Sequence, residues 1–339
     1  MSEKPLLTIV IPTYNAEKTV EKCINSLKKQ NTKFAYQVYI INDGSTDKTQ
    51  NVVESAINDD KYFRVFSKDN SGLSGTRNFG LARTNTEYIT FVDPDDFVNS
   101  NYVNELLTPY CADNECDLSI TGYQKEDDEG NAIFQSENSG TDSFTANDAM
   151  FRIFISGGYE GFTWNKAYRT SIFKKYNLQF TKESEPYEDL YLDLKYLQHC
   201  RKIVWRNNIT YHYVVHNSSA VHANRPGSVF NSTLPKKIDV LKEMLTFIPS
   251  NNTKAINALK AKICWDEMSI LRTIYAAPNR NEVPKETIRE LRQDNLKYRR
   301  AFLSNQILSQ KDKLIYWLNW YMPSTFAWVW NTFKLHGRG

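Results

Sequence analysis

The sequence has few of the features that mark secreted or membrane-spanning proteins. Its 339 residues include five cysteines, an odd number with no CxxC pair, which argues against a disulfide scaffold and against a zinc site. No uninterrupted apolar run of about 18 residues occurs, so we do not expect an ordinary transmembrane helix. The first residues, MSEKP, lead into a predicted strand without the apolar core of a signal peptide. We therefore expect a cytoplasmic protein.

Two nucleotide-binding signatures are also missing. No GxGxxG follows the first predicted strand, which argues against a dinucleotide-dependent oxidoreductase, and no GxxxxGK[ST] is present, which argues against a P-loop NTPase. The net charge of +3 is too small to indicate a nucleic-acid partner.

The charge is nevertheless unevenly distributed. Residues 231–339 carry 18 Lys and Arg against 9 Asp and Glu, whereas residues 1–230 carry 24 against 30. The length suggests two domains, and we place their boundary near residue 230. The basic second region is expected to lie near something anionic.

Strands and helices alternate along the first part of the chain. Apolar runs predict strands over 6–12, 37–42, 63–67 and 88–92, and helical spacing predicts helices over 17–29, 47–58, 75–83 and 101–111. This order indicates an α/β fold with a mainly parallel, Rossmann-like sheet flanked by helices, whose ligand lies beyond the carboxyl ends of the strands.

The pattern changes after about residue 127. A hairpin strand is predicted over 131–135, helices over 146–155, 164–176 and 188–199, and one or two strands over 202–215. From Pro235 onward the chain is predicted to be wholly helical, over 236–248, 252–276, 284–304 and 311–334.

Two segments at the predicted ligand edge carry chemistry. Asp93, Asp95 and Asp96 follow the strand YITFV, and carboxylates so close together suit Mg²⁺ or Mn²⁺, although a solvated acidic turn is the alternative. The segment NSGLSGTRN (70–78) offers glycines, a helix N-terminus and Arg77, which together can hold a diphosphate.

The motifs taken together resemble those of the family 2 glycosyltransferases. The matching stretches are VIPTYNAE (10–17), INDGSTD (41–47), NSGLSGTRNFGL (70–81), FVDPDDFV (91–98), TWNKAYRTSIF (163–173) and EPYEDLYL (185–192). The resemblance covers roughly residues 5–215, and 231–339 resembles nothing comparable. It implies the GT-A fold and an inverting, metal-dependent transferase that uses a nucleotide-diphosphate sugar, usually a UDP-sugar.

The resemblance also implies roles for individual residues. The residues expected to bind the nucleotide sugar are Pro12, Tyr14 and Glu17 at the nucleotide, Asp43 at the uracil edge, Asn70 and Arg77 near uridine and diphosphate, and Asp93 at the ribose. Asp95 is expected to bind Mn²⁺ or Mg²⁺.

The expected catalytic base is Asp189, the second residue of a Glu-Asp pair. A carboxylate at a helix N-terminus stays ionised, as a base must, but a simple helix cap is the alternative. The adjoining Glu188, together with Trp164 and His216, is assigned to the sugar and acceptor pocket. Trp164 could stack on a sugar or pack in the core, and His216 could bind metal or phosphate or have an ordinary structural role.

The C-terminal segment 314–335 is rich in Trp, Tyr and Phe, is flanked by basic residues, and is broken by Pro323. We expect it either to attach peripherally to a membrane or to pack as a helical hairpin, on the domain or on another subunit. A membrane contact through 311–339 would place the protein at the inner face of the cell membrane. The acceptor would then be a glycan or a lipid-linked glycan, in the synthesis of capsule, exopolysaccharide or teichoic acid.

Two other functions are compatible with a fold of this class. One is a catalytically silent module that binds nucleotides or glycans, and the intact acidic motifs argue against it. The other is a sugar nucleotidyltransferase, which usually requires a Gly-rich, Arg- or Lys-containing signature after the first strand. The segment PTYNAEKTV does not supply that signature.

Overall fold

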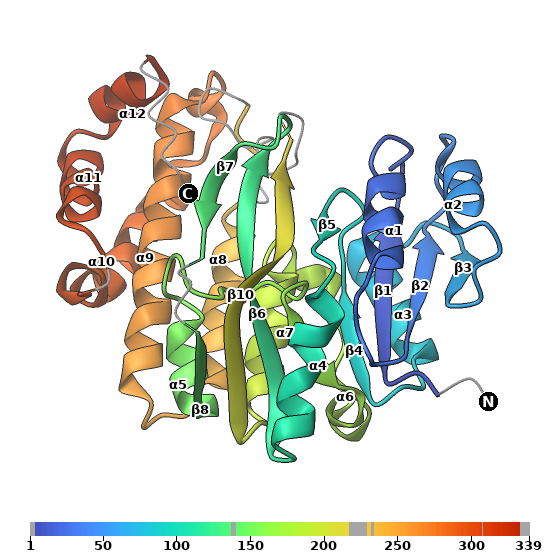
Figure 1. Cartoon of the computed structure of the whole chain (residues 1–339). Helices are drawn as coiled ribbons and strands as arrows, with labels where there is room; N and C mark the ends of the chain where they lie inside the picture. Colours follow the sequence, from blue (N-terminus) through green and yellow to red (C-terminus); the bar gives the residue numbers. More distant parts are fainter. Residues whose placement is uncertain (1–3, 137–139, 217–228, 232–233, 307, 333–339) are drawn as a thin grey trace. The chain divides into compact units, whose positions relative to one another are not determined.

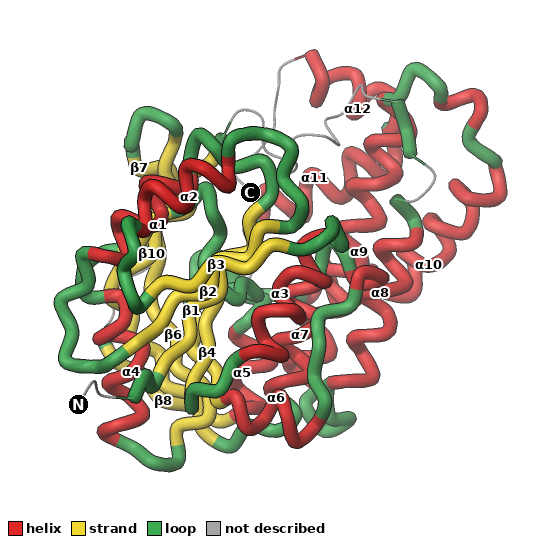
Figure 2. The backbone as a smooth tube through the Cα atoms, turned by 90° about the vertical axis from the view of Figure 1, so that its right-hand side faces the viewer, coloured by secondary structure: helices red, strands yellow, loops and turns green. Residues whose placement is uncertain are grey.

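The chain forms two compact units, residues 1–216 and residues 217–339 (Figure 1). The computed structural model describes residues 4–136, 140–216, 229–231, 234–306 and 308–332. Every strand of these residues belongs to the first unit, and the described part of the second unit is helical (Figure 2). The mixed α/β fold with a helical C-terminal region predicted from the sequence is confirmed.

Four parallel strands build the first half of the sheet, in the order β3-β2-β1-β4. They are β1 (Leu7–Thr13), β2 (Tyr36–Asn42), β3 (Phe63–Ser67) and β4 (Tyr88–Phe91). All residues of β1 are buried, as a strand covered on both faces requires. The connecting helices are α1 (Val20–Lys28), α2 (Thr49–Ile57) and α3 (Gly72–Arg83). Figures 1 and 2 show α1 and α2 on one face of these strands and α3 on the other.

The second half of the sheet is mixed. A short strand, β9 (Lys166–Arg169), runs antiparallel between β4 and β6 (Cys116–Asp127), and β10 (Lys202–Val215) runs parallel to β6. The smaller strands are β5 (Phe97–Val98), β7 (Ala132–Gln135) and β8 (Thr141–Thr145). The helices of this half are α4 (Tyr102–Ala112), α5 (Ala146–Arg152), α6 (Thr170–Tyr176) and α7 (Glu188–Leu197).

One predicted helix is wrong over its first half. Residues 164–176 read as a single helix in the sequence, but the structure has β9 followed by α6. A four-residue strand is too short for its alternation to be told from the first turn of a helix. What makes it a strand is tertiary pairing with β4 and β6, which are distant in the sequence. The strands β5, β6 and β8 were likewise not predicted.

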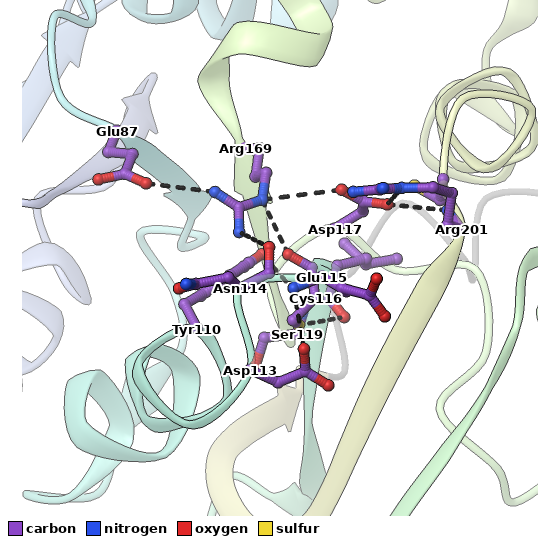
Figure 3. A network of polar contacts seen from close by, with 12 residues as sticks. Glu87, Tyr110, Asp113, Asn114, Glu115, Cys116, Asp117, Ser119, Arg169 and Arg201 are labelled. Carbon is purple, nitrogen blue, oxygen red and sulfur yellow. Dashed lines mark hydrogen bonds and ion pairs between the residues drawn. The ribbon is translucent and has the colours of Figure 1, made fainter.

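A polar network fastens β9 into the sheet at the edge away from the carboxyl end of β4 (Figure 3). The guanidinium of Arg169 donates to the carbonyl oxygen of Cys116 at 2.8 Å and forms an ion pair with Glu87 at 3.2 Å. It also lies 3.8 Å from the carboxylate of Asp117, which accepts a 2.8 Å hydrogen bond from the backbone N–H of Arg201. The antiparallel strand is therefore held by side-chain contacts in addition to its short ladder.

The second unit is built around one long helix. Its helices are α8 (Lys236–Met244), α9 (Thr253–Ala276), α10 (Lys285–Ser304), α11 (Gln310–Tyr321) and α12 (Pro323–Thr332). The central α9 packs against all four of the others. The helix α11 ends at Tyr321 and α12 begins at Pro323, so the helical segment is interrupted there, as the sequence predicted. Among the described residues, no helix is both long and apolar enough to cross a membrane.

The contact between α3 and the sheet depends on a glycine. A Cβ atom at Gly80 would lie 2.5 Å from Cγ1 of Val10 and 2.8 Å from Cδ1 of Ile41, both in buried strands. We expect Gly80→Val to lower the free energy of unfolding by about 1–3 kcal/mol through overpacking. Urea unfolding measures this change. The exposed Ala82→Val on the same helix is the control, and equal stability of the two variants would contradict the close approach.

Candidate active site

The residues expected to border the nucleotide lie where β1 ends. Pro12 is buried in the strand, whereas the side chain of Tyr14 is exposed just beyond it. The carboxylate of Glu17 accepts a 2.8 Å hydrogen bond from the backbone N–H of Lys48, which precedes α2. The turns that follow β1 and β2 are therefore joined at the carboxyl edge of the sheet.

Asp43 lies at the end of β2 and orders the start of α3. Its buried carboxylate accepts hydrogen bonds from the N–H groups of Ser71 and Gly72, both at 2.9 Å, and forms an ion pair with Lys68. Burial opposes ionisation, but the bonds from Lys68 and Ser71 hold the pKa of Asp43 below its ordinary value. The side chain of Asn70 donates to the carbonyl oxygen of Asp43 at 3.0 Å. The structure therefore brings Asp43 and Asn70 together.

Arg77 is the centre of the site. Its side chain comes from α3 and is only 1% exposed. Its guanidinium lies 3.0 Å from the carboxylate of Asp93 after β4, and 2.7 Å and 3.4 Å from those of Asp189 and Glu188 on α7. Burial disfavours its charge, but the three carboxylates raise the pKa of Arg77. Arg77, which is expected near the diphosphate, is therefore paired with carboxylates of the protein itself.

Three carboxylates around one guanidinium leave an excess of negative charge. Burial and the charge of Asp189 raise the pKa of Glu188 to about 7. The pKa of Asp93 is raised to about 6, chiefly by burial and by the charges of Asp95 and Asp189, although Arg77 opposes the shift. Perturbation of this kind is typical of functional sites.

Both carboxylate oxygens of Asp189 are oriented by hydrogen bonds. One oxygen accepts from Arg77, and the other accepts from the N–H and the hydroxyl of Thr163, each at 3.2 Å. The first turn of α7 has no side-chain cap. The hydrogen bonds to the carboxylate of Asp189 therefore come from Arg77 and Thr163, and its role as a base stays a prediction.

The acidic turn after β4 contains one anchored carboxylate and one that is less engaged. Asp96 is buried and accepts hydrogen bonds from the hydroxyl of Tyr211 at 2.6 Å and the N–H of Val214 at 2.8 Å, so it ties the turn to β10. Within the part of the chain that the structure describes, no other residue donates a hydrogen bond to the carboxylate of Asp95. Burial raises the pKa of Asp95.

The carboxylate of Asp95 fits a divalent ion whose other ligands would come partly from the substrate. Among the described residues, no three His, Cys, Asp or Glu side chains are grouped so as to bind a metal by themselves. Mg²⁺ and related ions often use one or two carboxylates and complete their coordination with phosphates and water. Asp95 at the ligand edge of the sheet is suited to that arrangement.

The remaining predicted pocket residues differ in their surroundings. Trp164 is buried, with its ring stacked between Phe162 and Tyr211 at centroid distances of 4.7 Å and 4.1 Å. The structure thus shows the core packing that was one of its two alternatives, with neither ring face open to a sugar. The imidazole of His216 contacts the carboxylate of Asp128.

Thr163, which sequence reasoning did not assign, contacts the candidate base, and Lys166, which the resemblance placed with Trp164 beside the sugar and acceptor, lies close to it in the chain. The ammonium of Lys166 is fully buried, lies 3.1 Å from the carboxylate of Asp193, and donates to the carbonyl oxygens of Glu160 and Phe162. It therefore fixes the backbone directly before Thr163. Both residues lie in the stretch TWNKAYR, but nothing in a lone threonine or lysine indicates a link to a carboxylate on a later helix.

Comparison with known proteins identifies the family. The model of glycosyl transferase family 2 matches residues 8–177, half of the chain, and the chain belongs to this family. EpsH of Bacillus subtilis (strain 168), a relative named as a glycosyltransferase, is 30% identical over 221 residues, which are 65% of this chain and 63% of EpsH. The chain therefore covers less than two thirds of that relative.

Solved structures of similar fold include glycosyltransferases with bound donors. TarS 1–349 of S. aureus in complex with UDP-GlcNAc superposes with a TM-score of 0.63 at 19% identity, covering 88% of this chain and 90% of that one. The mannosyltransferase PcManGT of Pyrobaculum calidifontis, in complex with GDP-Man and Mn²⁺, gives 0.56 at 12% identity, covering 98% and 89%. At these identities the likeness establishes the shared fold.

The raised pKa of Glu188 predicts how stability depends on pH. Folding raises this pKa from 4.5 to about 7, so between these values the folded state binds more protons than the unfolded one. The free energy of unfolding should therefore fall as pH rises through this window. Glu188→Gln cannot ionise and should show a shallower fall in urea unfolding at pH values from about 5 to about 7, with EDTA present.

The control for this series is Glu54→Gln, at an exposed position on α2, which should keep the wild-type slope. An unchanged slope in Glu188→Gln would show that the buried carboxyl group does not contribute to the pH dependence.

The buried ion pair of Lys166 and Asp193 can be tested by asking whether a second substitution restores the stability lost in the first. Lys166→Met leaves the carboxylate of Asp193 buried without its cation, so the free energy of unfolding should fall by about 3–5 kcal/mol. Adding Asp193→Asn removes the charge and retains the side chain that bonds to Tyr168. Urea unfolding should show that the double variant recovers most of the loss. A double variant as unstable as the single one would mean that the uncompensated charge is not the cause.

Proposed function

We propose that this family 2 glycosyltransferase moves a sugar from a UDP-sugar to a hydroxyl group of a glycan acceptor, with inversion at the anomeric carbon. The observation that carries this proposal is the shared guanidinium of Arg77, which lies 3.0 Å from Asp93 and 2.7 Å from Asp189. A donor-side carboxylate and the candidate base therefore lie within reach of one rigid, buried group. Single displacement requires donor and base at one place in this way.

In this proposal Asp189 is the general base. The acceptor hydroxyl transfers its proton to the carboxylate of Asp189 as its oxygen attacks the anomeric carbon, and the bond to the diphosphate breaks. Thr163 and Arg77 keep the carboxylate in one orientation, so the acceptor does not have to order it. Transfer in a single displacement inverts the configuration at the anomeric carbon.

On the donor side, Pro12, Tyr14, Glu17, Asp43 and Asn70 are proposed to surround the nucleotide. Pro12 lies near the end of β1 and the other four lie on the turns that follow β1, β2 and β3, at the edge where α/β sheets bind their ligands. The UDP-GlcNAc complex of TarS supports a uridine nucleotide for this chain. Asp93, although paired with Arg77, keeps a partly exposed carboxylate that can reach a ribose.

Asp95 is the proposed ligand of a divalent cation, Mn²⁺ or Mg²⁺. The Mn²⁺ in the PcManGT complex supports a divalent cation for this chain, as does the excess of carboxylates around Arg77. A bound cation would neutralise negative charge that develops on the departing diphosphate. The protein would supply the carboxylate of Asp95 as a ligand. Asp96 and Tyr211 hold the turn that carries it in place.

The proposal is tested by nucleotide release from a panel of UDP-, GDP- and dTDP-sugars with Mn²⁺ or Mg²⁺. We expect UDP release from one donor. Asp95→Asn should raise the Mn²⁺ concentration needed for half-maximal activity. Asp189→Asn should still bind that donor but lose about 10²–10⁴-fold in transfer once an acceptor is supplied, because a proton acceptor is missing.

Asp59→Asn, at an exposed position after α2, is the matched control and should behave like the wild-type protein. Full transfer by Asp189→Asn would remove the base assignment. Donor binding without turnover for every donor, metal and acceptor would favour a silent binding module, and release of pyrophosphate in place of UDP would indicate a nucleotidyltransferase.

A further inference from the structure

The two C-terminal helices expose large apolar side chains. On α11 and at its end, Leu314, Leu318, Tyr321 and Met322 are between 36% and 72% exposed, and Trp328 on α12 is 63% exposed. We call these five residues the tail surface. Single exposed apolar residues are ordinary, but five of the twelve large apolar side chains that are exposed among the described residues fall within 314–328.

Apolar residues occupy the outward side of α11, while its inward side combines aromatic packing of Tyr316 on Phe302 with buried hydrogen bonds. Leu314, Leu318 and Tyr321 are four and three residues apart and so share one side. The residues turned inward carry polar groups: Asn319 donates to the carbonyl oxygen of Met268 at 2.8 Å, and Tyr316 donates to Asn295 at 2.8 Å. These buried hydrogen bonds fix the rotation of α11. The apolar side is therefore outward because of specific contacts.

Cationic groups accompany this apolar side. Lys311 and Lys313 lie on α11, whose one acidic residue, Asp312, is engaged in a capping box with Ser309. The guanidinium of Arg292 lies 4.5 Å from the ring centre of Trp320, and that of Arg299 lies 5.8 Å from that of Trp317. Residues 231–339 as a whole carry 18 basic against 9 acidic side chains. The helices that carry the tail surface therefore belong to a region of net positive charge.

We propose that the tail surface docks on an anionic lipid bilayer. Leu, Met, Tyr and Trp side chains partition into the interface, and Lys and Arg beside them attract acidic headgroups. The helices have 12 and 10 residues, so the attachment is peripheral, parallel to the surface. A second copy of the chain is a poorer occupant, because it would bring one set of cations against another. This inference goes beyond the transfer chemistry and does not depend on it.

Vesicle flotation of the full chain tests the proposal. The wild-type protein should float with phosphatidylcholine vesicles that contain phosphatidylglycerol, bind pure phosphatidylcholine much less, and be released by high salt. Leu314→Glu with Leu318→Glu should lower the apparent affinity at least about tenfold, because two carboxylates replace inserted apolar groups. Trp fluorescence should shift to the blue on binding, and less so in Trp328→Phe.

Ile133→Glu is the matched control, since Ile133 is 46% exposed on β7 in the other unit, and it should bind vesicles like the wild-type protein. Circular dichroism should show that all variants are folded. Absence of wild-type flotation, or flotation that the double variant retains, would overturn the proposal. So would light scattering that shows a lipid-free dimer which the leucine variants dissociate, because the surface would then be a protein interface.

Discussion

The site depends on one buried cation. The guanidinium of Arg77 is shared by Asp93, Glu188 and Asp189, which come from the end of a strand and the start of a helix more than 90 residues later. Without this guanidinium three carboxylates would be enclosed without compensation, at a cost of several kcal/mol. The packing of α3, the turn after β4 and α7 is therefore tied to a single electrostatic requirement. That requirement keeps the proposed base next to the donor side of the sheet.

The same cluster holds more negative than positive charge. One guanidinium does not balance three carboxylates, and burial together with the neighbouring carboxylates raises the pKa values of Glu188 and Asp93. Further positive charge close by would relieve this imbalance, and a divalent ion at Asp95 is one source of it. A diphosphate would in turn be attracted to the ion and not to Arg77 directly. In the proposed function, the buried arginine would act on the donor through the carboxylates that it positions.

These contacts also show which features of the fold and the site the sequence does not predict. The strands β1 to β4 could be predicted because each is a short apolar run between polar turns, and their alternation with helices predicted at which edge of the sheet a ligand is expected. The partners of Arg77 could not be predicted, because a guanidinium binds carboxylates and phosphates with the same fork of donors. Its carboxylate partners on α7 are 111 and 112 residues away. Likewise β9 becomes a strand only through pairing with β4 and β6.

In the helical unit, too, the sequence leaves open how the side chains are arranged. Its sequence shows many aromatic residues, but composition does not say which of them face outward. The buried amide of Asn319 settles the rotation of α11 and leaves Leu314, Leu318 and Tyr321 on the outside. Apolar side chains exposed in this way gain nothing from contact with water. Attachment to a bilayer would instead make the exposed side useful, since confining the enzyme to a surface raises its effective concentration toward acceptors held there.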